Sequence, residues 1–179
     1  MIPGKNSEVI TMNIMTVRYI DNLSNLKSGE ISILRTMRHK DLDEDLDGFD
    51  LFTGIWWPLR EKNQRAPQRE TAWLIAKLYA CYPLPQVNES FMPVLLGMLA
   101  QYNDVLAKQI TKLNDTIVST PVPMLELPLG QAIRKIQKKF TGLDWVSLTD
   151  TLSRWGYNKQ REVWVQAFNS AKYSREVEK

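Results

Sequence analysis

The sequence predicts an all-α protein, a helical bundle of about seven to nine helices, and three observations support this fold class. Apolar residues recur every three or four positions over most of the 179 residues. No stretch alternates apolar and polar side chains as a half-buried β-strand does. Apolar residues make up 44% of the chain and charged residues 24%, a balance typical of a folded protein with a hydrophobic core.

The first two helices are expected before residue 40. Residues 14–26 carry apolar side chains at helical spacing, namely Ile14, Val17, Ile20 and Leu23. Ser28 is expected to cap a second helix that continues through Met37. Arg35 and Arg38 lie three positions apart, so both project from one side of that helix.

An acidic loop is expected over residues 41–50, which carry six acidic and no basic side chains. Part of it matches the front half of a calcium-binding EF-hand loop, with Asp43, Asp45, Asp47 and Gly48 at the expected positions. Gly54 stands where such a loop needs a bidentate glutamate. We therefore favour a solvated acidic loop over a metal site.

The middle of the chain is more apolar. The segment 49–59 contains Pro58 near its end, and burial of its Trp56-Trp57 pair is favoured over an exposed docking patch. Pro67 suits the first turn of a helix that runs to about Tyr82. Because that helix is apolar nearly all round, we expect it at the centre of the core.

One long helix is expected over residues 91–113, because Pro93 is tolerated in a first helical turn. Three prolines mark residues 114–128 as a connector, namely Pro121, Pro123 and Pro128. Residues 129–140 then form an apolar helix face, and basic side chains gather on the opposite face, namely Arg134, Lys135 and Lys138.

Two further helices close the chain. Asp144 is expected to cap the first, and Gly156 to end it in left-handed geometry. Asn158 is expected to cap the last helix. Three tryptophans fall on apolar helix faces and are expected in the core, namely Trp73, Trp145 and Trp164.

Several classes of function are disfavoured. One cysteine, Cys81, and one histidine, His39, exclude an internal disulfide and a Cys/His zinc cage. The sequence holds no glycine-rich phosphate loop and no nucleophile elbow. We therefore expect no enzymatic activity, no catalytic residue, no cofactor and no metal. We expect His39 on the surface at a helix end and Cys81 as a buried structural thiol.

The cellular location is expected to be cytoplasmic. No apolar run reaches the ~18 residues that a membrane span needs, and the first residues lack the pattern of a secretory signal. The net charge is +3, but residues 41–50 carry −6, so the rest of the chain carries +9. This segregation favours a polyanionic partner about as strongly as it favours an ordinary solvated surface.

One block of residues resembles a known family. Leu143-Asp144-Trp145 precedes a leucine helix ending in Trp155-Gly156, and a basic turn leads to a last helix with Trp164 and Phe168. This block resembles the C-terminal signature of the small-subunit family of type I-E CRISPR Cascade complexes. Shorter likenesses lie upstream, at Ser28-Gly29-Glu30 with Ile33-Leu34-Arg35, at Gly48-Phe49 with Leu51-Phe52, and at residues 73–79. The family's second arginine in a Leu-Arg-Arg element is Thr36 here, with Arg38 the candidate replacement, and residues 86–128 match no family segment.

The resemblance implies two helical subdomains, with a boundary placed at 1–85 and 86–179 or alternatively near 121–128. It also implies a non-enzymatic antiviral subunit whose partners are crRNA, both strands of target DNA in the R-loop, the backbone and large Cascade subunits, and a second copy of itself. In such guided complexes base pairing reads the sequence. The small subunit then needs only cations that contact phosphates, to stabilise the guide–target hybrid and the displaced strand.

On this basis the sequence offers candidate nucleic-acid contacts. The first set comprises Arg35, Arg38, Arg60, Arg65, Arg69, Arg134, Lys135 and Lys138, and the second set comprises Arg154, Lys159 and Arg161. Any one of them alone is more often an ordinary surface cation, so the prediction concerns the group.

Two alternatives remain open. The chain could be a helical protein–protein adaptor without direct nucleic-acid contact, using Trp56-Trp57 and the acidic loop as docking elements. A weaker alternative is an acid/base or metal enzyme that uses His39 with the acidic loop, although no partner nucleophile accompanies that histidine.

Overall fold

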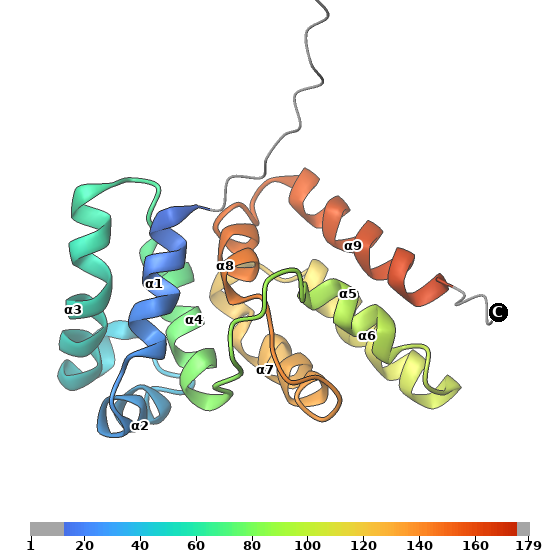
Figure 1. The fold of residues 1–179 in the computed structure, drawn as a ribbon, viewed down its shortest axis with the longest axis horizontal. Coiled ribbons are helices and arrows are strands. Elements are labelled where there is room, and N and C mark those ends of the chain that lie inside the picture. The colour runs from blue at the N-terminus through green and yellow to red at the C-terminus, as the bar shows by residue number, and fades with distance from the viewer. Residues whose placement is uncertain (1–12, 175–179) are drawn as a thin grey trace, which may run out of the picture.

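The computed structural model describes residues 13–174, and over that range it confirms the all-α prediction. Nine α-helices and two short 3-10 turns make up this part of the chain (Figure 1). Their bounds are α1 Ile14–Ser24, α2 Ser28–Thr36, η1 Leu42–Glu44, α3 Leu46–Lys62, α4 Arg69–Cys81, α5 Met92–Leu99, α6 Asp104–Val118, η2 Val122–Met124, α7 Glu126–Ile136, α8 Trp145–Ser153 and α9 Asn158–Tyr173. None of these helices is long and apolar enough to cross a membrane.

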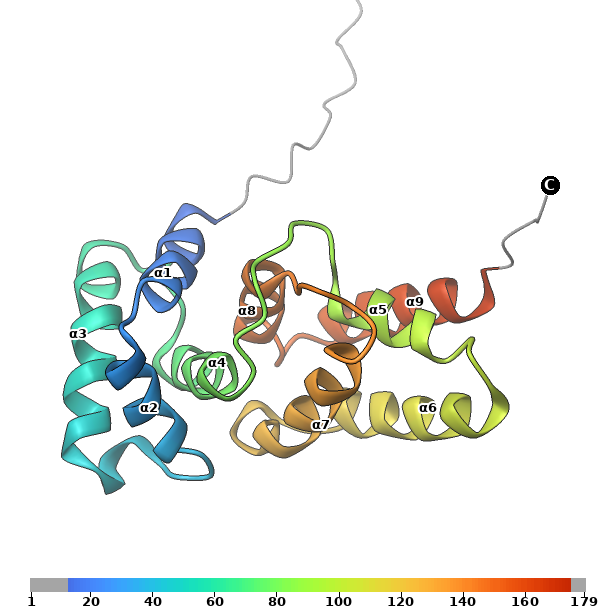
Figure 2. The same cartoon turned by 60° about the horizontal axis from the view of Figure 1, so that its bottom comes forward.

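Helices α1 to α4 gather on one side of the molecule and α5 to α9 on the other (Figures 1 and 2). Helix α4 lies between the two groups, contacting α2 and α3 on one side and α7 and α8 on the other. Its side chains are buried from Thr71 to Leu78, which confirms the central place predicted from its apolar composition. The predicted subdomain boundary at residue 85 falls in the segment between α4 and α5, and it stays a prediction.

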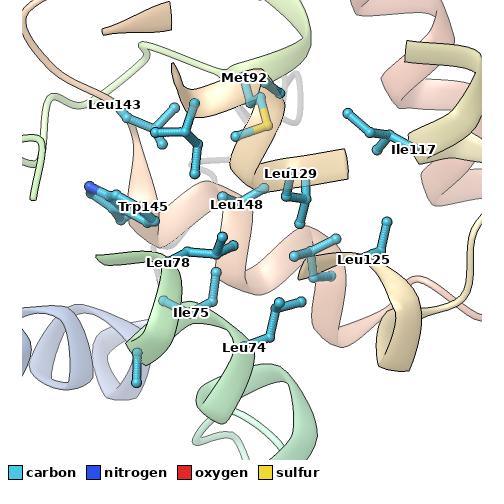
Figure 3. Close-up of a cluster of buried hydrophobic side chains, with 14 of the residues drawn as sticks. Leu74, Ile75, Leu78, Met92, Ile117, Leu125, Leu129, Leu143, Trp145 and Leu148 are labelled. Atoms are coloured by element: carbon cyan, nitrogen blue, oxygen red, sulfur yellow. The ribbon is translucent and has the colours of Figure 1, made fainter. Parts of the chain in front are cut away.

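One hydrophobic core runs through both groups of helices. Leu74, Ile75 and Leu78 of α4 face apolar side chains from the second group (Figure 3). These partners are Met92 of α5, Leu129 of α7, and Leu143, Trp145 and Leu148 in and before α8. The three tryptophans expected in the core, Trp73, Trp145 and Trp164, are all buried.

Asp144 joins helix α8 to the segment that follows α4. As predicted, its carboxylate caps α8 by accepting the N–H of Ser147, at 2.9 Å. It also accepts the side-chain amide of Gln86 at 2.8 Å and the N–H of Glu89 at 3.0 Å. These bonds satisfy buried oxygens that would otherwise lose hydration without compensation. Asp144 therefore holds the connector 85–90 against α8.

The single long helix predicted over residues 91–113 is wrong. The structure breaks it into α5 and α6, with exposed residues between them. Asn103 is the reason, because its side-chain oxygen accepts the N–H of Leu106 at 2.7 Å and so starts a new helix. Helix α6 then continues to Val118, into the segment predicted as a connector.

Several local predictions also need correction. The acidic loop is not a loop throughout, because it contains η1 and the start of α3, where Asp45 accepts the N–H of Asp47 at 3.0 Å. Trp56 is buried, but Trp57 is 47% exposed. The predicted burial is therefore confirmed for Trp56 and wrong for Trp57.

Several of the predicted helix ends differ from those in the structure. The residue that precedes α2 is Lys27, and the one that precedes α9 is Tyr157, so Ser28 and Asn158 are first helical residues rather than caps. Gly156 does not adopt left-handed geometry. Positive φ angles occur instead at His39 and Glu89 among the described non-glycine residues.

Candidate nucleic-acid interface

The end of α2 carries the first two predicted contacts. Arg35 lies in the last turn of α2 and Arg38 just beyond it, and both are exposed. The Arg35 Nε donates to the carbonyl oxygen of Ala80, in the last turn of α4, at 3.3 Å. Cations at the end of a helix are stabilised by the partial negative charge of its free carbonyls. The two arginines therefore lie where α2 meets the end of α4.

An ion-pair cluster holds this region against α7. Glu126, the first residue of α7, pairs with the buried ammonium of Lys77 from α4. Glu126 also accepts the backbone N–H of His39 at 2.7 Å and lies 3.0 Å from its Nδ1 atom. Lys77 donates in addition to the carbonyl oxygen of Lys40, at 3.0 Å. A buried charge needs such partners, so the cluster has a structural role.

This cluster adjoins a small cavity where two predicted contacts meet. The cavity has a volume of about 70 Å³, and Arg38 and Arg134 both line it. Arg38 follows α2 and Arg134 lies on α7, so the fold brings together residues that are far apart in the sequence. The rest of the lining includes Cys81, Tyr82 and Gln131.

The charges around this cavity affect the pKa of the Cys81 thiol. Burial raises the pKa of Cys81, and the positive charges of Arg38 and Arg35 oppose that rise. Glu126 adds to the rise. Arg35 and Arg38 therefore lie close enough to Cys81 to lower its pKa. We call Arg35, Arg38 and Arg134 together the α2–α7 cluster. Cys81 itself is half-buried rather than fully buried as predicted.

Lys135 and Lys138 extend the basic end of α7. Lys135 lies in the last turn of α7 and Lys138 shortly after it. Lys138 is exposed and Lys135 is half-buried. Neither lies within ion-pair distance of a carboxylate in the part of the chain that the structure describes.

Two more of the predicted contacts, Arg65 and Arg154, lie near the start of α1. Asn13 donates to the carbonyl oxygen of Arg65 at 2.7 Å, which places the α3–α4 loop beside α1. Thr16 donates to Asp150 of α8 at 2.6 Å. Burial raises the pKa of Asp150, while the hydrogen bonds that its carboxylate accepts from Thr16 and Asn13 and the positive charge of Arg154 oppose the rise. The backbone of Arg65 and the charge of Arg154 therefore both lie near the beginning of α1.

Two of the predicted contacts have internal roles. Arg60 donates to the carbonyl oxygens of Gln64 and Ala66, at 2.7 and 2.9 Å, and so shapes the loop after α3. Arg161 of α9 donates to the carbonyl oxygen of Trp155 at 3.0 Å and lies over its ring at 5.3 Å. Their guanidinium groups are partly occupied by these bonds, so fewer of their donors face solvent.

The remaining two predicted contacts differ in their surroundings. Arg69, at the start of α4, pairs with Asp43 at 2.9 Å, and both side chains are largely exposed. An exposed pair of this kind contributes little to stability and partly neutralises the arginine. Lys159, in the first turn of α9, is exposed.

The structure also brings together cations that are not among the predicted contacts. Lys108 and Lys112 lie one turn apart on α6, beside Lys172 of α9, and all three line one groove. Lys139 lies over the ring of Tyr102 at 5.0 Å. The four-residue spacing of Lys108 and Lys112 was the available signal. The family resemblance covers no part of residues 86–128, so it indicated no contact there.

The acidic stretch offers little to a metal ion. Within residues 13–174 no group of three or more histidine, cysteine or acidic side chains is arranged to hold one. Several of its carboxylates serve local structure instead. Asp45 caps α3, Glu44 accepts the N–H of Asp41 at 3.0 Å, and Asp43 pairs with Arg69.

Comparison with solved structures identifies proteins of similar fold. One is a CRISPR-associated protein of the Cse2 family from Thermus thermophilus, which has a TM-score of 0.68 and 17% identity over 87% of this chain and 98% of its own. Another is CasB from M. ruber, with a TM-score of 0.68 and 16% identity over 90% of this chain and 94% of its own. No family model and no curated protein matches the sequence. The structural neighbours are therefore CRISPR-associated proteins of the Cse2 and CasB type.

Proposed function

We propose that this chain is the small subunit of a crRNA-guided Cascade complex and acts there without catalysing a reaction. Its partners in this proposal are crRNA, target DNA, the backbone and large subunits, and a second copy of itself. The whole-chain likeness to Cse2 and CasB proteins supports the proposal, as does the sequence resemblance around Leu143-Asp144-Trp145.

The convergence of Arg38 and Arg134 on one cavity is the observation that carries the proposal. Arg38 follows α2 and Arg134 lies on α7, and both residues line the same cavity. Glu126 is the carboxylate among the residues that line this cavity, and it is already paired with Lys77. The guanidinium charges of Arg38 and Arg134 thus remain available to phosphate oxygens, which arginine binds well.

Contacts of this kind suit a guided complex. Arginine and lysine neutralise phosphates without reading bases, and their contribution to affinity falls with salt. In guided systems the pairing of RNA with DNA reads the sequence. The proposed role is therefore to stabilise the guide–target hybrid and the displaced strand through the backbone, with Lys135 and Lys138 extending the α2–α7 cluster.

Arg65, Arg154 and Lys159 form a second proposed contact region near the start of α1 and the start of α9. These three have no ion-pair partner among the described residues. Arg60 and Arg161 contribute to it mainly by shaping the loops on which the others lie.

The test has two steps. The full chain is first co-expressed with the other subunits and guide RNA of a type I-E complex, and co-purification of the chain with the RNA-containing particle is expected. Binding of target DNA is then compared for the wild-type particle and the Arg38→Glu/Arg134→Glu variant over a range of salt concentrations. We expect weaker binding and a shallower salt dependence in the variant, with assembly unchanged.

Two outcomes would contradict the proposal. A chain that never joins such a particle is not its small subunit. An assembled particle whose DNA affinity and salt slope are unaffected by the two reversals does not use the α2–α7 cluster. A Lys27→Glu/Lys62→Glu variant is the matched control, because both lysines are exposed and neither pairs with a carboxylate in the described part of the chain.

The protein–protein adaptor is the second candidate function. Trp57 is 47% exposed and Leu46 is 79% exposed on α3, beside the carboxylates of Asp47 and Asp50. Exposed apolar residues mark a docking surface where they join into one contiguous patch. An adaptor would not retard single-stranded DNA in a gel at low salt, whereas the proposed Cascade subunit does so.

A further inference from the structure

A groove between α6 and α9 carries the strongest unassigned cluster of cations. Its volume is about 350 Å³, and its lining is Ala107, Lys108, Thr111, Lys112 and Asp115 of α6 with Lys172 of α9. All five α6 residues fall into two rows of four-residue spacing, 107–111–115 and 108–112, so they form one face of that helix. This face lies in the segment 86–128, where the sequence resemblance reached no family motif.

The ammonium group of Lys172 is held in place at the groove. It donates to the hydroxyl of Thr111 at 2.9 Å, across the gap between α9 and α6. It also lies 5.1 Å from the ring centre of Tyr173 and 6.0 Å from that of Phe168. Lysine side chains ordinarily lose much conformational freedom on binding. Lys172 has already lost part of it, so it is prepared for an anion.

The charges of the groove are available to a ligand. Lys108 and Lys112 are exposed, and neither they nor Lys172 pair with a carboxylate within residues 13–174. Asp115 is the one carboxylate of the lining. Three ammonium groups against one carboxylate leave a local charge of +2, which attracts a polyanion.

An exposed aromatic ring lies beside these cations. Tyr173 is 70% exposed and follows Lys172 directly. Proteins that bind single-stranded nucleic acid combine a basic groove, which follows the backbone, with aromatic rings on which bases stack. An acidic peptide would use the lysines but has no comparable use for an exposed ring, so the combination favours a nucleic-acid strand.

We propose that the α6–α9 groove, with Lys108, Lys112, Lys172 and Tyr173, binds the phosphodiester backbone of a single nucleic-acid strand and stacks one of its bases on Tyr173. This inference rests on the proposed function and adds a contact region separate from the α2–α7 cluster. Lys108 and Lys112 contact phosphates, Lys172 bridges Thr111 and the strand, and the groove reads no base sequence.

The experiment measures binding of the full chain to fluorescein-labelled oligothymidylate and oligouridylate by anisotropy, from low to moderate salt. Lys108→Gln/Lys112→Gln removes two exposed charges, and circular dichroism checks that it folds. Lys27→Gln/Lys62→Gln removes the same net charge elsewhere and is the matched control. We expect the groove variant to bind roughly fivefold or more weakly, with a salt slope lower by about 1.4 for two lost phosphate contacts. The control should change far less.

A second readout locates the strand. Oligonucleotides that carry 5-iodouracil are photo-crosslinked to the full chain, and the modified peptide is identified by mass spectrometry. Crosslinking at Tyr173 is expected, and it should be lost in Tyr173→Leu. Stronger binding of one of the two oligonucleotides shows which of them the groove prefers.

The outcomes separate this inference from the proposed function. If the groove variant and the control variant lose the same affinity and no crosslink forms at Tyr173, the groove is not a binding site. Such a result leaves the proposed binding through Arg38 and Arg134 unaffected. Failure of the wild-type chain to bind either oligonucleotide at low salt overturns the groove as well. If the chain does not join a Cascade particle but still binds oligonucleotides through the groove, only the proposed function is overturned. Groove-dependent binding of an acidic peptide but of neither oligonucleotide would show a protein ligand and overturn the inference.

Discussion

Gly97 of α5 lies directly against the backbone of Phe168 of α9. A Cβ atom at position 97 would lie 2.5 Å from the carbonyl oxygen of Phe168, and 2.9 Å from the backbone nitrogen of Lys172. Real Cβ atoms do not approach backbone this closely, so α5 and α9 pack together only because residue 97 has no side chain. The close contact with α5 therefore fixes the position of α9, which carries Lys172 and Tyr173.

We predict that Gly97→Ala destabilises the protein by about 1–3 kcal/mol, the usual cost of overpacking a rigid contact. Urea denaturation followed by circular dichroism measures the change. Gly54→Ala is the matched control, because Gly54 lies inside α3 with nothing within 4 Å of a new Cβ atom. That control should be stabilising by up to about 1 kcal/mol, since alanine favours helix more than glycine does. Equal effects of the two substitutions would contradict the close contact.

Glu126→Ala should destabilise the protein by about 3 kcal/mol, because it leaves the buried ammonium of Lys77 without its carboxylate. Lys77→Met/Glu126→Gln should recover most of this loss. Methionine fills the space without a charge, and glutamine keeps an oxygen that accepts the N–H of His39. The same denaturation measurement on the two variants tests the pair. A double variant less stable than Glu126→Ala would show that the ion pair itself is indispensable.

Asp150 should make the protein less stable at neutral pH than at mildly acidic pH. Its pKa is raised in the folded state by burial, so the folded protein binds the proton more tightly than the unfolded chain does. The destabilisation caused by the charged carboxylate is present above its folded-state pKa. It disappears as the pH falls to about 4, the pKa of the carboxyl in the unfolded chain.

Asp150→Asn removes this charge and keeps an oxygen for the Thr16 hydroxyl. We expect the variant to be more stable at pH ~7, by less than about 1 kcal/mol because the site is partly solvated. The advantage should vanish toward pH ~4. Urea denaturation of both proteins across this range is the measurement. An advantage that is constant with pH would mean that the Asp150 carboxyl is not perturbed.

Cys81 should report on the geometry of the α2–α7 cluster. Arg38 lowers the pKa of this thiol, against the larger effect of burial, so Arg38→Gln should raise that pKa further. Iodoacetamide reacts with the thiolate, so the pH dependence of the reaction rate gives the pKa of the thiol. A change in the accessibility of Cys81 alters only the plateau rate at high pH. Arg69→Gln, whose arginine pairs with Asp43, is the control and should leave the profile unchanged. Unchanged profiles in both variants would place Arg38 away from the cavity.

Much of the fold follows from residues near one another in the chain. The all-α class, the central position of α4 and the capping of α8 by Asp144 were predicted correctly, because helical spacing and capping act over three or four residues. The break at Asn103 was missed because Leu106 and Ile110 keep the same spacing whether the helix is continuous or restarts. The spacing of apolar residues alone did not distinguish the two cases.

The order of amino acids alone shows which side chains are cationic and which helix each one lies in or near. Their partners depend on how those helices pack. Arg38 and Arg134 share a cavity, Arg69 pairs with Asp43, and Arg60 and Arg161 are partly used on backbone carbonyls. The lysines of the α6–α9 groove meet only because α9 packs beside α6. The physical reason is that charges interact according to their distance and solvent exposure, and both are set by how the helices pack rather than by their order in the chain.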